Sequence, residues 1–182
     1  MDNNQQQLPD TRKIGQWMIY IMWAIVLLGL TYFFGGLLDK QRNPNQQVTG
    51  RVSVEGKPEV ILERNRYGHY VASGKINGHD VVFLLDTGAT NVSIPEAVAQ
   101  RVGLRRGAGH RVITANGIVQ VFATQLDRVE LGVIQLNDVR ASINPHMDGE
   151  EILLGMSFLR QLDFSQIGKQ LTLKQRIPFN GE

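Results

Sequence analysis

The chain has 182 residues and a formal net charge of +2, with 19 Lys and Arg against 17 Asp and Glu. Hydrophobic residues make up 42% and charged residues 20%, a balance that allows a packed core and excludes a wholly disordered chain. There is no cysteine, so disulfides, thiolate metal sites and a cysteine nucleophile are excluded. An excess of two positive charges is too small to indicate a nucleic-acid-binding protein.

A long apolar segment lies near the N-terminus, where residues 14–38 contain no charged side chain. As a helix, these 25 residues would be about 37 Å long, enough to cross a hydrocarbon core of about 30 Å with some tilt. Aromatic side chains lie toward both ends of the segment, as in the interfacial belts of membrane-spanning helices. We therefore predict a single transmembrane helix over residues 14–38.

Two other interpretations of this segment compete. A cleaved signal peptide requires a shorter apolar run and a cleavage site with small residues, whereas this run is long and ends in Gly-Gly-Leu-Leu-Asp-Lys. A buried core helix would carry polar residues along one face, and almost none are present. The flanking charges do not fix the orientation, because Arg12 and Lys13 are balanced by Lys40 and Arg42.

The remaining residues divide into a tail, a linker and one domain. Residues 1–13 are rich in Gln and Asn and are expected to form a disordered tail. Residues 39–60 begin as a polar segment that contains a proline, and they are expected to form a linker. Residues 61–182 are expected to form a single globular domain.

The domain is predicted to consist mostly of β-strands. Asn77-Gly78 separates two runs, residues 67–76 and 80–85, and is a strong β-hairpin signal. Asn116-Gly117 divides a second β run over residues 111–123. Many short strands separated by turns indicate a closed or sandwiched β fold. Further strands are expected over residues 124–133, 139–143 and 171–174.

Two short helices are expected among these strands. Ser93 and Glu96 have the spacing of a capping box, with Pro95 in the first turn and Gly103 as a stop signal. The second helix is expected over residues 156–162.

One segment has the features of a catalytic site, because apolar residues 82–85 run directly into Asp86-Thr87-Gly88. The apolar run predicts a buried strand, so the carboxylate that follows lies beside the core and needs hydrogen-bond donors. Gly88 allows a tight turn in which backbone N–H groups approach that carboxylate, and Thr87 supplies a hydroxyl. By itself the tripeptide is weak evidence, because an aspartate at a strand end is more often a turn residue.

A second apolar strand, residues 152–154, ends in Gly155 just before the second predicted helix. Three blocks together, residues 83–90, 114–117 and 153–159, resemble the retropepsin-like aspartic proteases, in particular the bacterial membrane-anchored branch of that family. The resemblance covers roughly residues 65–175. It implies an all-β acid-protease fold, a closed β-barrel with one lobe per chain and two short helices, preceded here by the transmembrane helix.

The resemblance assigns catalytic roles to three residues. Asp86 would be the catalytic carboxylate, and Gly88 would place its backbone N–H against it. Thr87 would form a hydrogen bond with its counterpart in a partner subunit. Leu154 and Gly155 would lie in the chain segment beside this active-site turn.

The resemblance also implies a flap over the substrate, formed by residues 111–122 with Asn116-Gly117 at its tip. The flap contains no Tyr, unlike that of the two-lobed pepsin-type enzymes, so its contacts with the substrate stay open. The substrate-binding residues implied by the resemblance are Ala89, Thr114, Ala115, Asn116 and Gly117.

Aspartic-protease chemistry needs two carboxylates, one that activates a water molecule and one that donates a hydrogen bond to the scissile carbonyl. The chain contains a single Asp-Thr-Gly, and its roughly 130 globular residues are too few for two lobes. An active enzyme would therefore be a homodimer in which Asp86 of each chain meets at the two-fold axis. Because water is the nucleophile, neither a metal nor a cofactor is expected.

The sequence thus predicts a single-pass membrane-anchored aspartic endopeptidase that acts on a peptide or protein substrate. By family resemblance it would lie in a bacterial inner membrane with its domain in the periplasm. The alternative is a catalytically silent, membrane-tethered β-barrel that acts as a binding or assembly module. The four histidines lack ligand spacing, and the basic stretch at residues 101–111 lacks aromatics, so neither a metal site nor a nucleic-acid partner is expected.

Overall fold

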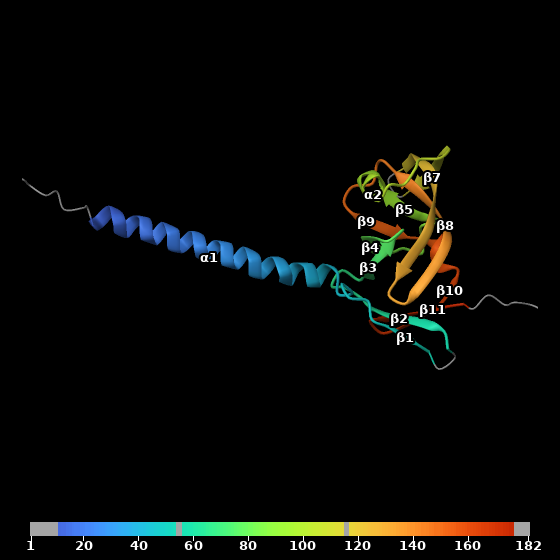
Figure 1. Ribbon diagram of the computed structural model, residues 1–182, viewed down its shortest axis with the longest axis horizontal. Coiled ribbons are helices and arrows are strands. Elements are labelled where there is room, and N and C mark those ends of the chain that lie inside the picture. The colour runs from blue at the N-terminus through green and yellow to red at the C-terminus, as the bar shows by residue number, and fades with distance from the viewer. Residues whose placement is uncertain (1–10, 54–55, 115–116, 177–182) are drawn as a thin grey trace, which may run out of the picture. The chain divides into compact units, whose positions relative to one another are not determined.

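The computed structural model describes residues 11–53, 56–114 and 117–176, and the chain forms two compact units, Met1–Asp39 and Lys40–Glu182 (Figure 1). The first unit is built on helix α1 (Thr11–Arg42), whose last residues belong to the second unit. Within the described residues, Gly15–Arg42 is the one helix long and apolar enough to cross a membrane. Residues 1–10 of the predicted tail lie outside the described residues, and the membrane span stays a prediction.

The larger sheet of the second unit carries the candidate site. Its strand order is β3-β4-β9-β5-β8-β7-β6, and β3 also pairs with β7, so the described pairings form a ring that leaves out only β6. The predicted all-β, retropepsin-like fold is confirmed. The strands are β3 (Val71–Ile76), β4 (His79–Leu85), β5 (Val92–Pro95), β6 (Gly109–Thr114), β7 (Gly117–Leu131), β8 (Ile134–Asn144) and β9 (Glu151–Leu154).

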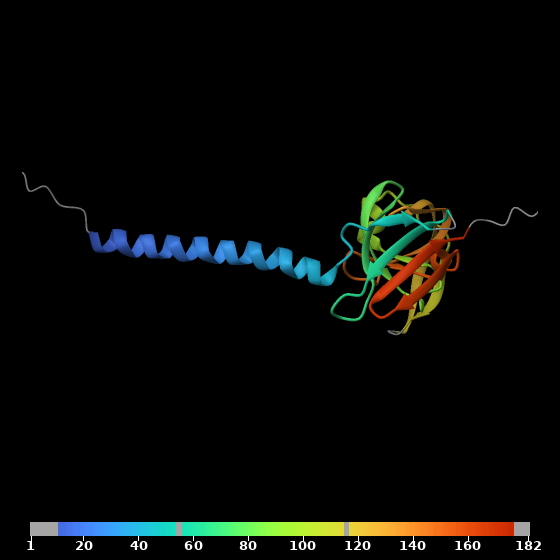
Figure 2. The same cartoon turned by 90° about the horizontal axis from the view of Figure 1, so that it is seen from below.

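A smaller sheet joins segments from the two ends of this unit. Its strand order is β1-β2-β11-β10, with every neighbouring pair antiparallel (Figures 1 and 2). The strands are β1 (Gly50–Val52), β2 (Pro58–Glu63), β10 (Leu162–Ile167) and β11 (Gln170–Gln175).

One hydrophobic core connects the two sheets and the short helices α2 (Glu96–Arg101) and α3 (Met156–Leu159). Phe83 of β4 and Phe158 of α3 are fully buried within it. Leu62 of β2 and Leu173 of β11 extend the same core under the smaller sheet. Burying aromatic and branched side chains contributes about 1.5–3 kcal/mol each, so this shared core fixes the strands around the site.

The structure corrects the prediction that residues 39–60 form a simple linker. Helix α1 continues to Arg42, Asn45 is buried, and β1 and the start of β2 lie inside this range. The Asn45 side chain donates to the carbonyls of Glu63 (2.9 Å) and Val71 (2.7 Å) and accepts from the Glu63 N–H (2.7 Å). Polar residues that indicated a tether therefore supply hydrogen bonds that fasten the chain to the domain.

The predicted capping box is also wrong. Residues 92–95 form β5, which pairs in parallel with β8, and the residue that precedes α2 is Pro95 rather than Ser93. The alternation of buried Val92 and Ile94 with more exposed Ser93 is that of a strand, and tertiary pairing overrides the local helix signal. Helix α3 ends at Leu159, earlier than predicted, because β10 begins at Leu162.

Candidate active site

Asp86 follows the last residue of β4, at the point where β4 and its parallel neighbour β9 end together. The register pairs Leu85 with Leu154, and the Asp86 N–H donates to the Leu154 carbonyl at 3.3 Å. Val81 and Phe83 on the inner face of β4 are buried, and Asp86 itself is half-buried. The strand thus delivers the carboxylate to the edge of the core.

The turn after Asp86 directs a backbone donor at its carboxylate. The Gly88 N–H donates to Asp86 Oδ1 at 2.8 Å, and the Ala89 N–H lies 3.3 Å from the Asp86 carbonyl. A Cβ atom on Gly88 would lie only 3.1 Å from that same Oδ1, so a side chain there would crowd the carboxylate. Thr87 is exposed on the outside of the turn.

The start of α3 holds this turn from the other side. The Met156 N–H donates to the Ala89 carbonyl (2.8 Å), and the Ser157 N–H donates to the Thr90 carbonyl (3.0 Å). A Cβ atom on Gly155 would lie 2.6 Å from the Ala89 carbonyl oxygen, so the glycine is required by close packing. The loop that carries Asp86 is therefore fixed by backbone hydrogen bonds along its length.

Ser157 is a support of this loop that the sequence analysis missed. Its buried hydroxyl accepts from the Val92 N–H (3.0 Å) and donates to the Arg140 carbonyl (2.7 Å). It therefore ties α3 to β5 and β8 at once. A hydroxyl residue among the apolar residues of α3 is the sequence signal that could have revealed it.

The β6–β7 hairpin corresponds to the predicted flap. Its last described pair is Thr114 with Gly117, and the Thr114 hydroxyl donates to the Gly117 carbonyl at 2.9 Å. Gly117 has a φ of 110°, which favours glycine. Two other residues predicted to bind substrate, Ala115 of the flap and Asn116 of its tip, lie outside the described residues.

A cavity of about 500 Å³ connects the Asp86 loop to this hairpin. Three residues predicted for the site, Asp86, Gly88 and Ala89, line it together with Thr114 of the flap. Four others do not line it: Thr87, Gly117, Leu154 and Gly155. Val112, Ile113 and Val121, which also line it, belong to the predicted flap over residues 111–122. The lining residues that sequence reasoning missed are Thr90, Asn91, Ser93, Ser142, Asn144 and Leu153.

Among the described residues that line this cavity, Asp86 is the only acid. Arginine side chains hold two carboxyls outside this cavity. Hydrogen bonds from Arg51 hold the pKa of Glu59 below its ordinary value, and a hydrogen bond from Arg106 does the same to the pKa of Glu96. The described part of one chain therefore presents one carboxyl to the cavity.

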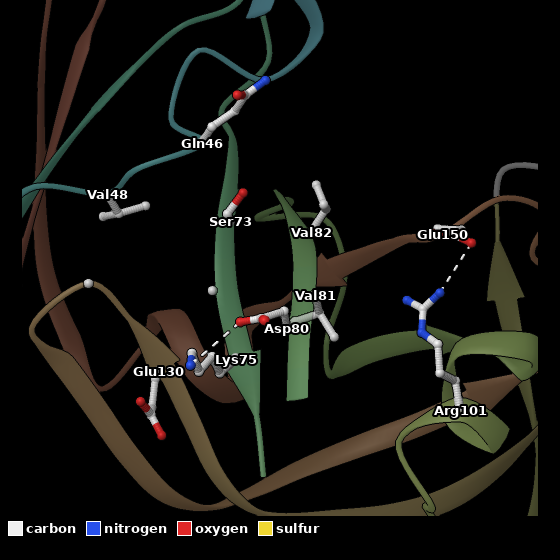
Figure 3. A pocket seen from close by; sticks show the side chains of 12 residues that line it. Gln46, Val48, Ser73, Lys75, Asp80, Val81, Val82, Arg101, Glu130 and Glu150 are labelled. Atoms are coloured by element: carbon white, nitrogen blue, oxygen red, sulfur yellow. Dashed lines mark ion pairs between the residues drawn. The ribbon is translucent and has the colours of Figure 1, made fainter. Parts of the chain in front are cut away.

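A larger hollow of about 670 Å³ lies over the opposite end of β4 (Figure 3). Charged side chains surround it in two ion pairs, Lys75 with Asp80 (3.6 Å) and Arg101 with Glu150 (3.1 Å). None of its lining residues belongs to the Asp86 loop or the flap hairpin. Although this hollow is larger than the cavity beside Asp86, it is not the candidate active site.

Comparisons with known proteins identify the family of this chain. The family model described as "gag-polyprotein putative aspartyl protease" matches residues 72–161, which include the Asp86 loop, the flap and Gly155. An uncharacterised protein of Sinorhizobium sp., encoded in the cobV 5′ region, is 31% identical over 172 residues, which are 88% of this chain and 74% of that protein.

Two Rickettsia proteins are also similar. An uncharacterised protein of Rickettsia prowazekii (strain Madrid E) is 26% identical over 119 residues, 63% of this chain and 50% of that protein. The crystal structure of a retropepsin-like aspartic protease from Rickettsia conorii has a TM-score of 0.53 at 23% identity, covering 71% of this chain and 95% of that one. The fold and the Asp-Thr-Gly loop are thus of the aspartic-protease class, with one lobe per chain. The chain belongs to the retropepsin-like aspartic protease family.

Proposed function

We propose that the protein is an aspartic endopeptidase, anchored in a membrane by α1 and active as a homodimer. The observation that carries this proposal is the hydrogen bond from the Gly88 N–H to Asp86 Oδ1, at the end of a cavity that the flap hairpin also lines. A carboxylate held on a rigid loop and open to a cavity is what water activation requires. The family membership supports the same reaction class.

The reaction needs a second carboxyl, and the two-fold symmetry of a dimer would supply it from Asp86 of the partner. The ionised carboxyl would take a proton from water as the water attacks the scissile carbonyl. The protonated carboxyl would donate a hydrogen bond to the carbonyl oxygen and later return a proton to the leaving amine. Thr87 is exposed beside Asp86, which leaves its hydroxyl available to a partner subunit.

The apolar helix has a physical role in this proposal. Confinement to a membrane raises the effective concentration of the subunits and favours dimers that are weak in solution. We propose a bacterial inner membrane with the domain in the periplasm, on the strength of the family resemblance. A cysteine-accessibility assay on a variant such as Ser165→Cys, which labels only a periplasmic domain in intact cells, tests the orientation.

The decisive experiment is cleavage of a diverse peptide mixture by the full chain in detergent micelles, read by mass spectrometry. Asp86→Asn is the control, because it keeps the size of the side chain and removes the acid. We expect cuts by the wild type that are absent from Asp86→Asn. A folded, dimeric wild type that makes no Asp86-dependent cut would contradict the proposal and favour a binding module.

A further inference from the structure

The floor of the cavity is a short row of side chains across three adjacent strands. In the register, Ser93 of β5 lies opposite Ser142 of β8 on one side and Leu153 of β9 on the other. All three residues line the cavity with Asp86. The middle of the floor therefore presents two hydroxyls, with the apolar side chain of Leu153 beside them on β9.

Two amide side chains extend this polar floor along the strands. Asn144 is two residues from Ser142 on β8, and side chains two apart on a strand lie on the same face. Asn91 immediately precedes β5, the strand that carries Ser93. Both asparagines line the cavity. The alternate residues Val92, Ile94 and Ile143 face the core and are fully or almost fully buried. The polar residues are thus confined to the face that lines the cavity.

Three of these side chains have hydrogen-bonding capacity that the described protein leaves unused. Ser142 is 5% exposed, and its hydroxyl has no partner among the described residues. The Ser93 hydroxyl has only the Met147 sulfur, a weak acceptor, at 3.8 Å. Asn144 Oδ1 accepts from the His146 N–H (3.0 Å), which leaves the two N–H donors of its amide for the cavity.

From this geometry we propose that the floor formed by Asn91, Ser93, Ser142 and Asn144 is a specificity subsite for a neutral hydrogen-bonding side chain of the substrate: Asn, Gln, Ser or Thr. The inference rests on the proposed peptidase function and adds to it a substrate class. It concerns a single subsite, since Leu153, Val112 and Val121 give other parts of the cavity an apolar lining.

The physical reason is that a buried hydrogen-bonding group loses more free energy when it is left unpaired than it gains when it is paired. A large apolar side chain seated on this floor would displace water from hydroxyls and amides and leave them unpaired, which is costly. A substrate amide or hydroxyl would instead make hydrogen bonds in place of those that the displaced water made. A charged side chain would gain no counter-ion from these four uncharged residues, so the floor discriminates against it too.

The test measures kcat/KM of the detergent-solubilised full chain on peptides that share one Asp86-dependent cleavage site. Each position flanking the cut is varied in turn between Asn, Gln, Ser, Thr, Leu, Val and Phe. We expect one position at which the neutral polar residues are preferred by about 5- to 10-fold, as the gain of one or two hydrogen bonds predicts. In the double variant Ser93→Ala/Ser142→Ala that preference should fall to about 2-fold or less, while preferences elsewhere are unchanged.

Two controls keep the outcomes distinct. Ser165→Ala, on exposed β10 outside the cavity, should keep the wild-type profile. Ser142→Thr should keep the polar preference, because it retains a hydroxyl. Asp86-dependent cuts by the wild type with apolar preference at every position would overturn this inference and leave the peptidase function standing, even if the double variant failed to fold. Absence of any Asp86-dependent cut would overturn both.

Discussion

The backbone of Gly155 lies directly against the Ala89 carbonyl, and a Cβ atom added to Gly155 would be 2.6 Å from that oxygen. The φ and ψ of Gly155, −85° and −172°, are extended angles that any residue adopts. The requirement for glycine is therefore one of space and not of backbone conformation. Because Ala89 is only three residues after Asp86, any side chain at position 155 would push on the loop that holds the carboxylate.

Gly155→Ala is accordingly expected to displace the Asp86 loop and to lower kcat/KM on the order of 100-fold, the usual result of moving a catalytic group by about 1 Å. The measurement is steady-state cleavage of one peptide that the wild type cuts. Gly109→Ala is the matched control, because the nearest atom to its Cβ is the movable Gln120 amide at 3.0 Å. A Gly155→Ala enzyme with wild-type kcat/KM would show that the loop tolerates the intrusion.

Ser157→Ala is expected to lower the free energy of unfolding by about 2 kcal/mol. The change leaves the buried Val92 N–H and the part-buried Arg140 carbonyl without the hydroxyl that pairs with both, and an unpaired buried group costs about 1–3 kcal/mol. Urea unfolding of the detergent-solubilised chain measures the difference. Ser165→Ala on exposed β10 is the control and should stay within about 0.5 kcal/mol of the wild type.

The parts of the candidate site that can be recognised in the sequence consist of consecutive residues. The apolar run into Asp86-Thr87-Gly88 and the flap turn at Gly117 depend on short-range geometry, so both could be recognised along the chain. The polar floor could not, because Ser93 and Ser142 are 49 positions apart and meet only through the parallel pairing of β5 with β8. No local pattern indicates which distant strand will lie beside a given serine.

The mistaken linker has a related cause. Composition shows that Asn43, Asn45 and Gln46 are polar, but it does not show whether water or the protein supplies their hydrogen-bond partners. The Asn45 side chain makes hydrogen bonds to backbone groups of Glu63 and Val71, as the backbone of a neighbouring strand would. The Asn45 carbonyl also accepts a hydrogen bond from the Ser73 N–H (3.0 Å). A side-chain amide that imitates the backbone has no sequence signal of its own.

Asn45→Ala is therefore expected to destabilise the domain by about 2 kcal/mol, since it removes the partner of the buried Val71 carbonyl and of the part-buried N–H and carbonyl of Glu63. It should also expose the chain after Arg42 to limited trypsin digestion, and we expect the wild-type segment, which is attached to the domain, to be digested more slowly. Asn137→Ala, at an exposed position of β8, is the matched control. Equal digestion rates in the wild type and Asn45→Ala would show that this segment is a free tether after all.

The smaller sheet gives a prediction for the pH dependence of stability. Glu59 is buried, accepts hydrogen bonds from Arg51 Nε (2.9 Å) and Nη2 (2.5 Å), and lies 3.5 Å from Lys174 Nζ. The Arg51 hydrogen bonds lower the pKa of Glu59 below its ordinary value of 4.5, although burial acts in the opposite direction. The stabilisation is thus present above the unfolded-state pKa and is lost as the pH falls through the lower pKa of the folded state.

Comparing the free energy of unfolding of the wild type with that of Glu59→Gln isolates the contribution of this carboxylate. At about pH 6 the wild type should have the higher free energy of unfolding, and the gap should narrow steadily as the pH is lowered to about 3. Urea unfolding at several pH values measures both curves. Two curves that stay parallel over the whole range would mean that the ion pair of Glu59 with Arg51 contributes no pH-dependent stability.

The last prediction concerns the assembly that the reaction requires. Since each chain presents a single acid to the cavity, peptidase activity should depend on subunit association, and the specific activity of the micelle-bound chain should fall when protein and micelles are diluted together. Dilution into lipid vesicles at a constant protein-to-lipid ratio should preserve it, because the subunits stay confined to the same surface. Mixing wild type with excess Asp86→Asn gives the complementary result: heterodimers with one acid should be inactive, so activity should fall below that of the wild type alone. Specific activity that is independent of dilution, together with no inhibition by Asp86→Asn, would require a complete active site within one chain.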